Sequence, residues 1–263
     1  MSIPAPPRWA LRGRWLAAAI GVIVVAGVCV RLGIWQLDRL DQRRDFNRRV
    51  EAAGANAPAP LDDLVPAASN GVEDGEFRRA VAEGTWDTDR EMLVLSKSLV
   101  GTPGQHVVTP LLLDDGTAVL VERGFVPVVD PDARVPVRAI APRGAVTVEG
   151  VVHQSQSGGR FLPSSDDAVA AGTIGHLTRI DVPLIDKQLP YDLRPGYLRV
   201  EAELAQGAGI TPTPLPPPEL GDGPHLGYAF QWFSFAVVFV GGWVILARRA
   251  SRRDHGATAH PDR

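Results

Sequence analysis

The chain has 263 residues, of which 45% are hydrophobic and 22% charged, with a formal net charge of −3 at pH 7. This balance argues against a nucleic-acid partner, because proteins that bind nucleic acid carry an excess of Lys and Arg. The single cysteine, Cys29, excludes an intramolecular disulfide, and it does not follow the small residue that a lipoprotein site needs.

The first predicted element is an apolar run over residues 15–30 that follows three arginines. The helical pattern continues past Arg31 to residue 37, provided that Arg31 snorkels or faces a partner. A secretion signal is the alternative, but no small-x-small cleavage site follows the run. We predict an uncleaved membrane helix at 15–37, preceded by a cytoplasmic tail at 1–14.

Five arginines and three aspartates are interleaved after this span, between residues 38 and 49. The spacing from Asp45 to Arg48 and Arg49 is that of helical neighbours, so opposite charges can pair along one helix. We predict that the helix continues out of the membrane as a solvated, charged helix.

Residues 38–224 are numerous enough for one domain with a hydrophobic core, and strand patterns dominate them. The stretch 53–75 is rich in Ala, Pro, Asn and Asp, which indicates a linker with one turn at 61–64. Six runs of alternating or β-branched residues predict strands: 77–83, 91–97, 105–113, 117–123, 145–152 and 197–204. Asp115-Gly116 supplies a hairpin turn, and we predict a β-rich, mainly antiparallel (α+β) domain.

Two further elements precede the second span. A short helix is predicted at 181–189, with Asp181 as its N-cap and Pro183 in its first turn. The proline-rich segment 211–218 predicts a stiff, extended strut that leads into the span.

The last predicted element is a membrane helix at 225–247, because residues 226–247 carry no charge and reach roughly 30 Å. Four arginines follow closely, in a basic tail at 248–263, and such clusters stay in the cytoplasm. We therefore predict two transmembrane helices that flank one extracytoplasmic domain at 38–224. The expected location is the cell (plasma) membrane, with both termini cytoplasmic.

The sequence contains no catalytic motif that we can interpret. It has no G-x-S-x-G elbow, H-E-x-x-H pair, phosphate-binding loop or C-x-x-C pair. His106 and His153 lie in predicted strands, where an ordinary strand position and a ligand role both stay open. We predict that the protein is not an enzyme.

His225 stands at the outer end of the second span, with Tyr228 and Trp232 at i+3 and i+7 on one helical face. An interfacial aromatic belt is one interpretation of this face. Haem binding is another, because haem iron takes a neutral imidazole in a flat-walled apolar cleft. The first span leaves the same membrane surface through Trp35 and Gln36, which predicts a cleft for an amphipathic ligand between the helices and beneath the outer domain.

Four motifs, taken in chain order, resemble the surfeit locus protein 1 family of cytochrome c oxidase assembly factors. They are Leu32-Gly-Ile-Trp-Gln-Leu37-x-Arg39, Gly104-Gln-His-Val-Val-Thr-Pro-Leu111, Val119-Leu-Val-Glu-Arg-Gly-Phe-Val-Pro127 and His225-x-x-Tyr228-Ala229-x-Gln231-Trp232-Phe233. Phe125 departs from the family pattern, which has Trp after the Arg-Gly pair. Arg31 within the first helix is a second departure.

The resemblance implies a non-catalytic helper that promotes insertion of haem a into the large subunit of a haem–copper oxidase. It implies that His225 binds the haem iron, and the surrounding cofactor-binding residues that we predict are Tyr228, Trp232, Trp35, Gln36 and Arg31. The predicted partners are the large oxidase subunit, haem a synthase and the lipid bilayer. The alternative is a membrane-anchored scaffold or sensor whose outer domain binds only protein.

Arg123 and Gly124 lie at the end of a predicted strand. We predict a structural turn in which Arg123 pairs with a carboxylate and Gly124 supplies a positive φ or a close approach. Contact with the oxidase is the alternative for this pair.

Overall fold

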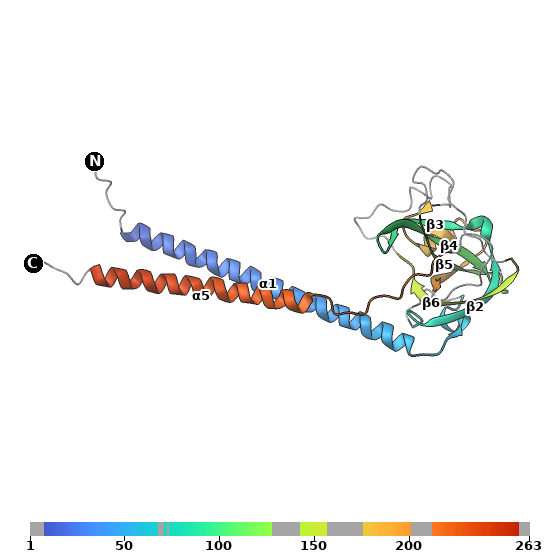
Figure 1. The fold of residues 1–263 in the computed structure, drawn as a ribbon, viewed down its shortest axis with the longest axis horizontal. Helices are drawn as coiled ribbons and strands as arrows, with labels where there is room; N and C mark the ends of the chain where they lie inside the picture. The colour runs from blue at the N-terminus through green and yellow to red at the C-terminus, as the bar shows by residue number, and fades with distance from the viewer. Residues whose placement is uncertain are drawn as a thin grey trace, which may run out of the picture. The chain divides into compact units, whose positions relative to one another are not determined.

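The structure of the protein is a computed structural model that describes residues 8–67, 71–72, 74–127, 143–156, 176–200 and 212–257. It forms two compact units. One unit, Met1–Asn47 with Leu220–Arg263, is a pair of helices, and the other, Arg48–Glu219, is a β domain (Figure 1).

Two long helices, α1 (Arg8–Gly54) and α5 (His225–Ala257), begin and end the described chain. Each contains a stretch that is long and apolar enough to cross a membrane. Helix α1 continues without a break from the apolar run through the charged stretch, which confirms the predicted continuation. Helix α5 also continues for ten residues beyond the predicted end at residue 247.

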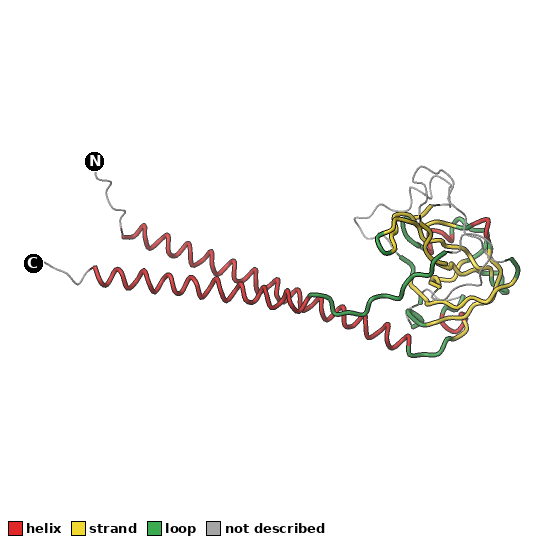
Figure 2. The backbone as a smooth tube through the Cα atoms, viewed as in Figure 1, coloured by secondary structure: helices red, strands yellow, loops and turns green. Residues whose placement is uncertain are grey.

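Within their unit, α1 and α5 run antiparallel (Figure 2). They meet along a seam of small residues. Ala26 and Cys29 of α1 are buried against Ala236 of α5. Further along, a Cβ atom added to Gly33 would lie 2.6 Å from the ring of Phe233, so only glycine permits this approach. Buried and half-buried positions on α1 recur at alternating intervals of three and four residues, as in other packed helix pairs: 26, 29, 33, 36 and 40.

Five strands of the second unit close into a barrel. They are β2 (Arg79–Trp86), β4 (Thr102–Leu112), β5 (Ala118–Pro127), β6 (Ala145–Gln154) and β8 (Leu193–Val200). The order around the barrel is β2-β6-β8-β5-β4, and the pairing of Thr85 with Leu112 closes it. Three strands extend the sheet: β1 (Ala59–Pro60) on β2, β3 (Met92–Leu99) on β4, and β7 (His176–Leu177) on β3.

All six predicted strands are present, with ends that differ by a few residues. The predicted strand 197–204 begins earlier, at Leu193, and its residues 201–204 lie outside the described part of the chain. The β4–β5 hairpin is confirmed, and Gly116 adopts a φ of +84° in its turn. Five of the eight described pairings are antiparallel, whereas β5 and β8 pair in parallel across a long sequence separation.

The barrel interior holds the main hydrophobic core, because each of the five barrel strands contributes side chains from one face to the same cluster. Leu61, Leu64, Val65 and Val72 join this cluster. The prediction of a linker at 53–75 was therefore wrong for these residues, which fill one part of the core. The turn predicted at 61–64 is present as the one-turn helix α2 (Leu61–Leu64).

A second cluster covers the outer face of β5 and β8 and includes Leu120, Tyr197 and Ile185. Ile185 belongs to α4 (Val182–Asp186), which confirms the helix predicted near 181–189. Asp181 stands at the N-cap position but makes no side-chain cap bond. Instead, the Ser155 hydroxyl accepts the Val182 N–H at 2.9 Å, so a residue distant in sequence satisfies the first turn.

The segment predicted as a strut pairs with the barrel. Thr213 and Phe125 exchange two backbone hydrogen bonds, with N···O distances of 2.7 and 2.8 Å. Gly124 makes the approach possible: its φ is +140°, and an added Cβ would lie 2.4 Å from the Thr213 carbonyl oxygen. The strut is thus anchored by an edge pairing, which the prediction over 211–218 did not include; residue 211 itself lies outside the described ranges.

Candidate functional site

A contact between the two helices brings together two of the residues predicted from sequence. His225 is the first residue of α5, and its Nδ1 lies 2.9 Å from Oε1 of Gln36 on α1. An amide oxygen only accepts hydrogen bonds, so the imidazole Nδ1–H is the donor. The His225 ring is half-buried at the end of the seam.

The turn before His225 is tied to α1 by three further contacts. The Asn47 side-chain amide donates to the Leu220 carbonyl at 3.1 Å, and Arg43 Nε donates to the Gly221 carbonyl at 3.1 Å. Arg44 pairs with Asp222 at 2.8 Å, and this hydrogen bond lowers the pKa of the Asp222 carboxyl. The two hydrogen bonds to backbone carbonyls, from Asn47 and Arg43, fix where α5 begins and hence where the imidazole lies.

Gly223 leaves the second nitrogen of His225 uncrowded. Its φ is +66°, a conformation that glycine adopts without strain. A Cβ atom added there would lie 3.5 Å from Nε2 and 3.4 Å from Cδ2 of the imidazole. Because residue 223 carries no side chain, it does not block Nε2 on that side.

The other predicted site residues lie elsewhere on the helices. Trp232 is half-buried on the seam, next to Ala236. Tyr228 is 48% exposed and Trp35 is 42% exposed, so neither ring is packed into the seam. Instead, the Arg39 guanidinium lies over the Trp35 ring, 5.6 Å from the ring centroid. Arg31 is exposed on α1.

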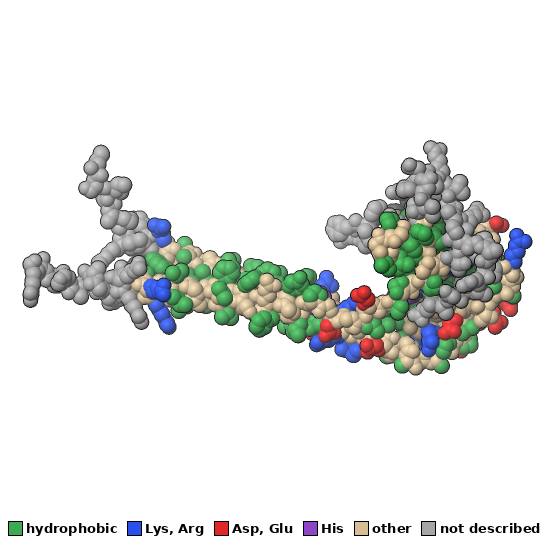
Figure 3. Space-filling view, in the orientation of Figure 1, with side chains coloured by type: hydrophobic (Ala, Val, Ile, Leu, Met, Phe, Trp, Pro, Cys, Tyr) green, Lys and Arg blue, Asp and Glu red, His purple; other side chains and the backbone are tan. Residues whose placement is uncertain are grey.

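The outer surface of the helix pair is apolar over its middle and charged at both ends (Figure 3). The exposed side chains include Ile23, Val28 and Ile34 on α1, and Phe230 and Val237 on α5. This distribution is the one expected of helices surrounded by lipid, because water would not solvate so many aliphatic and aromatic groups.

Within the described residues, no group of three or more His, Cys, Asp or Glu side chains is placed to hold a metal ion. A single histidine suits a metal that arrives with most of its ligands, and the iron of haem arrives with four porphyrin nitrogens. His225 could hold such an iron through Nε2, because its Nδ1–H bond to Gln36 orients the ring.

Sequence reasoning missed most of the buried charge in the barrel, but it predicted Arg123 correctly. Arg123 is 3% exposed and lies on the core face of β5. Its Nη1 donates to Oε2 of Glu91 at 3.0 Å, and its guanidinium lies 5.3 Å from the centroid of Trp86. The predicted pairing with a carboxylate is confirmed, and so is the close approach at Gly124. The predicted turn was wrong, because β5 continues through both residues to Pro127.

The opposite face of β5 carries a second set of buried charges around Glu122. His106 Nδ1 lies 2.6 Å from one Glu122 oxygen, and Arg199 Nε donates to the other at 2.7 Å. Burial alone would raise the pKa of the Glu122 carboxyl, but the His106 hydrogen bond and the Arg199 charge lower it below its ordinary value. The sequence signal for the Arg123 contacts and for the Glu122 set was the same: Glu122 and Arg123 are adjacent charged residues within an otherwise apolar strand.

His153 lies beside this set and stacks on Tyr197, with ring centroids 5.4 Å apart. Burial, with the nearby Arg199 charge, lowers the pKa of His153 to about 4. Its imidazole is therefore neutral near pH 7. His106, the other histidine of the β domain considered from the sequence, is a strand residue of β4 whose partner is the Glu122 carboxylate.

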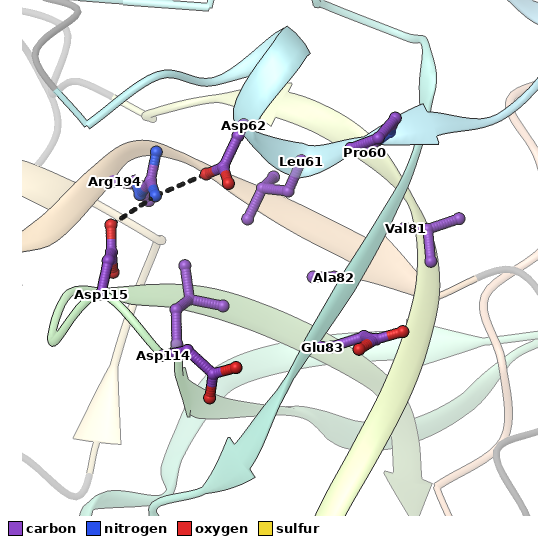
Figure 4. Close-up of a pocket in the computed structure, with 10 residues that line it drawn as sticks. Pro60, Leu61, Asp62, Val81, Ala82, Glu83, Asp114, Asp115 and Arg194 are labelled. Atoms are coloured by element: carbon purple, nitrogen blue, oxygen red, sulfur yellow. Dashed lines mark hydrogen bonds and ion pairs between the residues drawn. The ribbon is translucent and has the colours of Figure 1, made fainter.

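The β domain also has a pocket of about 390 Å³ with an acidic rim (Figure 4). Asp62 and Asp115 point towards Arg194, whose Nη2 lies 2.6 and 2.8 Å from their carboxylate oxygens. Arg194 also donates to the Val65 carbonyl at 2.8 Å, so it joins α2 to the hairpin turn. None of the predicted site residues lines this pocket.

Comparison with known proteins shows which family the chain belongs to. The model of the SURF1 family matches residues 23–237. The chain belongs to the SURF1 family. An uncharacterized SURF1-like protein of Mycobacterium tuberculosis is 28% identical over 262 residues, covering 96% of this chain and 92% of the relative. A SURF1-like protein of Rickettsia bellii is 25% identical over 88% of this chain and 91% of its own length.

One similar protein carries a functional name. The cytochrome oxidase assembly protein of Saccharomyces cerevisiae is 33% identical over 107 residues, which cover 39% of this chain and 27% of the yeast protein. The SURF1-family match includes the seam, the barrel and the start of α5 with His225. Phe125, where this SURF1-family chain departs from the expected Trp, is 4% exposed and lies edge-on to the His106 ring at 6.3 Å, so its bulk fills a buried position.

Proposed function

We propose that this protein assists the assembly of cytochrome oxidase, and that its helix pair holds haem a before the haem enters the large subunit of the haem–copper oxidase. The observation that carries the proposal is the imidazole of His225, held through Nδ1 by Gln36 with its Nε2 next to a glycine. The name of the yeast relative supports the assembly role, and membership of the SURF1 family supports its transfer to this chain.

His225 would bind the haem iron through Nε2. The exposed rings of Tyr228 and Trp35 would lie near it, because Tyr228 is one turn along α5 and Trp35 precedes Gln36 on α1. When bound, haem supplies a redox-active iron, whereas the protein supplies binding, orientation and release. Arg31 would pair with a haem propionate or snorkel to the membrane surface. Haem a synthase is the proposed source of the haem, and no catalytic step by this chain is required.

The proposed location follows from the two apolar helices and the arginines after residue 247. Both helices span the cell membrane, both termini are cytoplasmic and the β domain is extracytoplasmic. Fusion of a periplasm-active phosphatase at Gly116 should give active enzyme, and fusion at the C-terminus should not. The reverse pattern would overturn the orientation.

A deletion strain tests the assembly role. Oxidase turnover should fall and the ratio of haem a to copper in the oxidase should drop, while total haem a synthesis continues. The defect should be partial, because an assembly factor speeds a loading step that also proceeds slowly without it. Unchanged turnover and stoichiometry would reject the assembly role and favour the membrane-anchored scaffold or sensor.

A variant tests the haem site directly. His225→Ala should lose haem a from the protein purified in mild detergent from cells that make haem a, as read from the pyridine haemochrome spectrum. His255→Ala removes a histidine from the other end of the same helix and serves as the matched control. Equal haem content in both variants would remove His225 from the site.

A further inference from the structure

We propose that Gln36 is a positioning residue for His225. It holds the neutral imidazole as the Nδ1–H tautomer, which leaves Nε2 unprotonated and able to bind a metal. The tautomer follows from the helix–helix contact alone, whereas the identity of the metal group as haem rests on the proposed function.

Packing before and after Gln36 on α1 holds the Gln36–His225 contact in place. Gln36 follows Gly33, whose contact with the Phe233 ring sets the distance between the helices, and precedes Leu40, which is 3% exposed. On the other side, Asn47 holds the Leu220 carbonyl at 3.1 Å. A register shift of one residue would turn Gln36 about 100° away from the seam, so these contacts keep its amide opposite His225.

The chemistry depends on which nitrogen carries the proton. A neutral imidazole has one N–H and one lone pair, and only the nitrogen with the lone pair can bind a metal. With the proton on Nδ1 donated to Gln36 Oε1 at 2.9 Å, the lone pair is on Nε2, the atom beside Gly223. The hydrogen bond also fixes the ring plane, as acceptors behind metal-binding histidines do.

The acceptor is an amide and not a carboxylate, and this difference has a consequence for affinity. A carboxylate behind the imidazole would increase its basicity and strengthen the metal bond, whereas a neutral amide orients the ring with a smaller increase. A protein that passes its ligand on needs the orientation without very tight binding. Gln36 meets both conditions.

The first experiment observes the tautomer without haem. The full chain, labelled with ¹⁵N-histidine, is purified in mild detergent at pH 8, and the His225 signals are those missing from His225→Ala. The wild type should show a protonated Nδ1 and an unprotonated Nε2. Gln36→Ala should lose this fixed pattern, and Gln42→Ala, the same substitution at an exposed glutamine of α1, should keep it. A protonated Nε2 in the wild type, or an unchanged pattern in Gln36→Ala, would overturn the proposal.

The second experiment uses haem a extracted from a purified oxidase as the probe. Gln36→Ala should weaken haem a binding by about 10- to 100-fold, the range seen when an acceptor behind a metal ligand is removed. Gln36→Glu should bind more tightly than the wild type and shift the iron midpoint potential to a lower value. Slow alkylation of Cys29, which is buried in the seam, checks that the helices of each variant stay packed.

The outcomes separate this inference from the proposed function. If His225→Ala abolishes haem binding while Gln36→Ala binds like the wild type, the positioning role is overturned and the haem site stands. If the wild type takes up no haem a, the proposed function falls, and the ¹⁵N spectra still decide whether Gln36 sets the tautomer.

Discussion

The helix pair and the barrel both contain buried polar side chains, but they hold them differently. In the barrel, Arg123 and Arg194 are each 3% exposed and each contacts several groups. In the helix pair, His225 is only half-buried and is held by one hydrogen bond, which its Nδ1–H donates to Gln36 Oε1. A buried group with several partners cannot move without breaking all of these contacts, whereas a half-buried group with one partner at the start of a helix can take a ligand. For this reason we assign the barrel charges a structural role and place the proposed binding site at His225.

Removal of a barrel charge should give the largest effect. Arg123→Ala takes the guanidinium from Glu91 and Trp86 and should cost about 3–5 kcal/mol, the usual loss when one member of a buried pair is removed. Thermal unfolding of the full chain in mild detergent, followed by circular dichroism, measures the change. Arg79→Ala, which breaks an exposed pair with Glu149, is the control and should have little effect. Normal stability of Arg123→Ala with a lost oxidase phenotype would instead place Arg123 at a functional contact.

The anchored strut should be nearly as sensitive. Gly124→Ala forces a side chain against the Thr213 carbonyl at a φ of +140° and should destabilise the barrel by about 2–3 kcal/mol. Gly116→Ala, at a φ of +84° with no atom within 4 Å of the added Cβ, isolates the backbone strain at about 1 kcal/mol. If the two variants unfold at the same temperature, the close contact with Thr213 adds nothing to the loss of stability in Gly124→Ala.

The dependence of stability on pH tests whether the fold keeps the buried His153 imidazole unprotonated. The pKa of His153 is lowered to about 4 in the fold from its ordinary 6.5, so below pH 6.5 the unfolded chain binds a proton that the folded chain does not. Stability should therefore fall as the pH falls, by roughly 2 kcal/mol between pH 6.5 and pH 5. His153→Phe keeps a ring against Tyr197 and should lose this part of the pH dependence. Identical pH profiles would show that His153 is not the group responsible.

In the helix pair, a seam substitution should have a smaller effect on stability but a clear effect on packing. Gly33→Ala places a Cβ 2.6 Å from the Phe233 ring, which should cost about 1–2 kcal/mol and separate the helices. Alkylation of Cys29, the only cysteine, should become several-fold faster in detergent at pH 8. Gly27→Ala, where an added Cβ meets nothing within 4 Å, should leave the rate unchanged.

The exposed ion pair between α1 and the turn before α5 should have the smallest effect. Arg44→Ala breaks the pair with Asp222, but both side chains are about half exposed and water screens their charges. We expect no measurable change in the melting temperature and no change in haem content. A loss of haem comparable to that of His225→Ala would mean that this pair holds the turn before α5.

The sequence predicted strands well where local patterns determine them. The β4–β5 hairpin followed from Asp115-Gly116, because turn residues act over a few positions. The parallel pairing of β5 with β8 did not follow, since nothing in a strand's own residues states which distant strand it joins. Leu61 and Leu64 were assigned to a linker for the same reason: two leucines among Ala, Pro and Asp give no periodic signal until the barrel interior surrounds them.

The amino-acid sequence was enough to predict the two long apolar helices and the strand-rich region between them, and to find the motifs that include Gln36 and His225. Hydrophobic periodicity, turn residues and motif order are local properties. Tertiary structure alone decided that Glu122 meets His106 and Arg199, that Thr213 pairs with Phe125, and that Gln36 faces His225 while Trp35 does not. These contacts join residues as many as 189 positions apart. Their geometry depends on how closely the helices and strands pack, which is set by Gly33, Gly124 and the closed barrel.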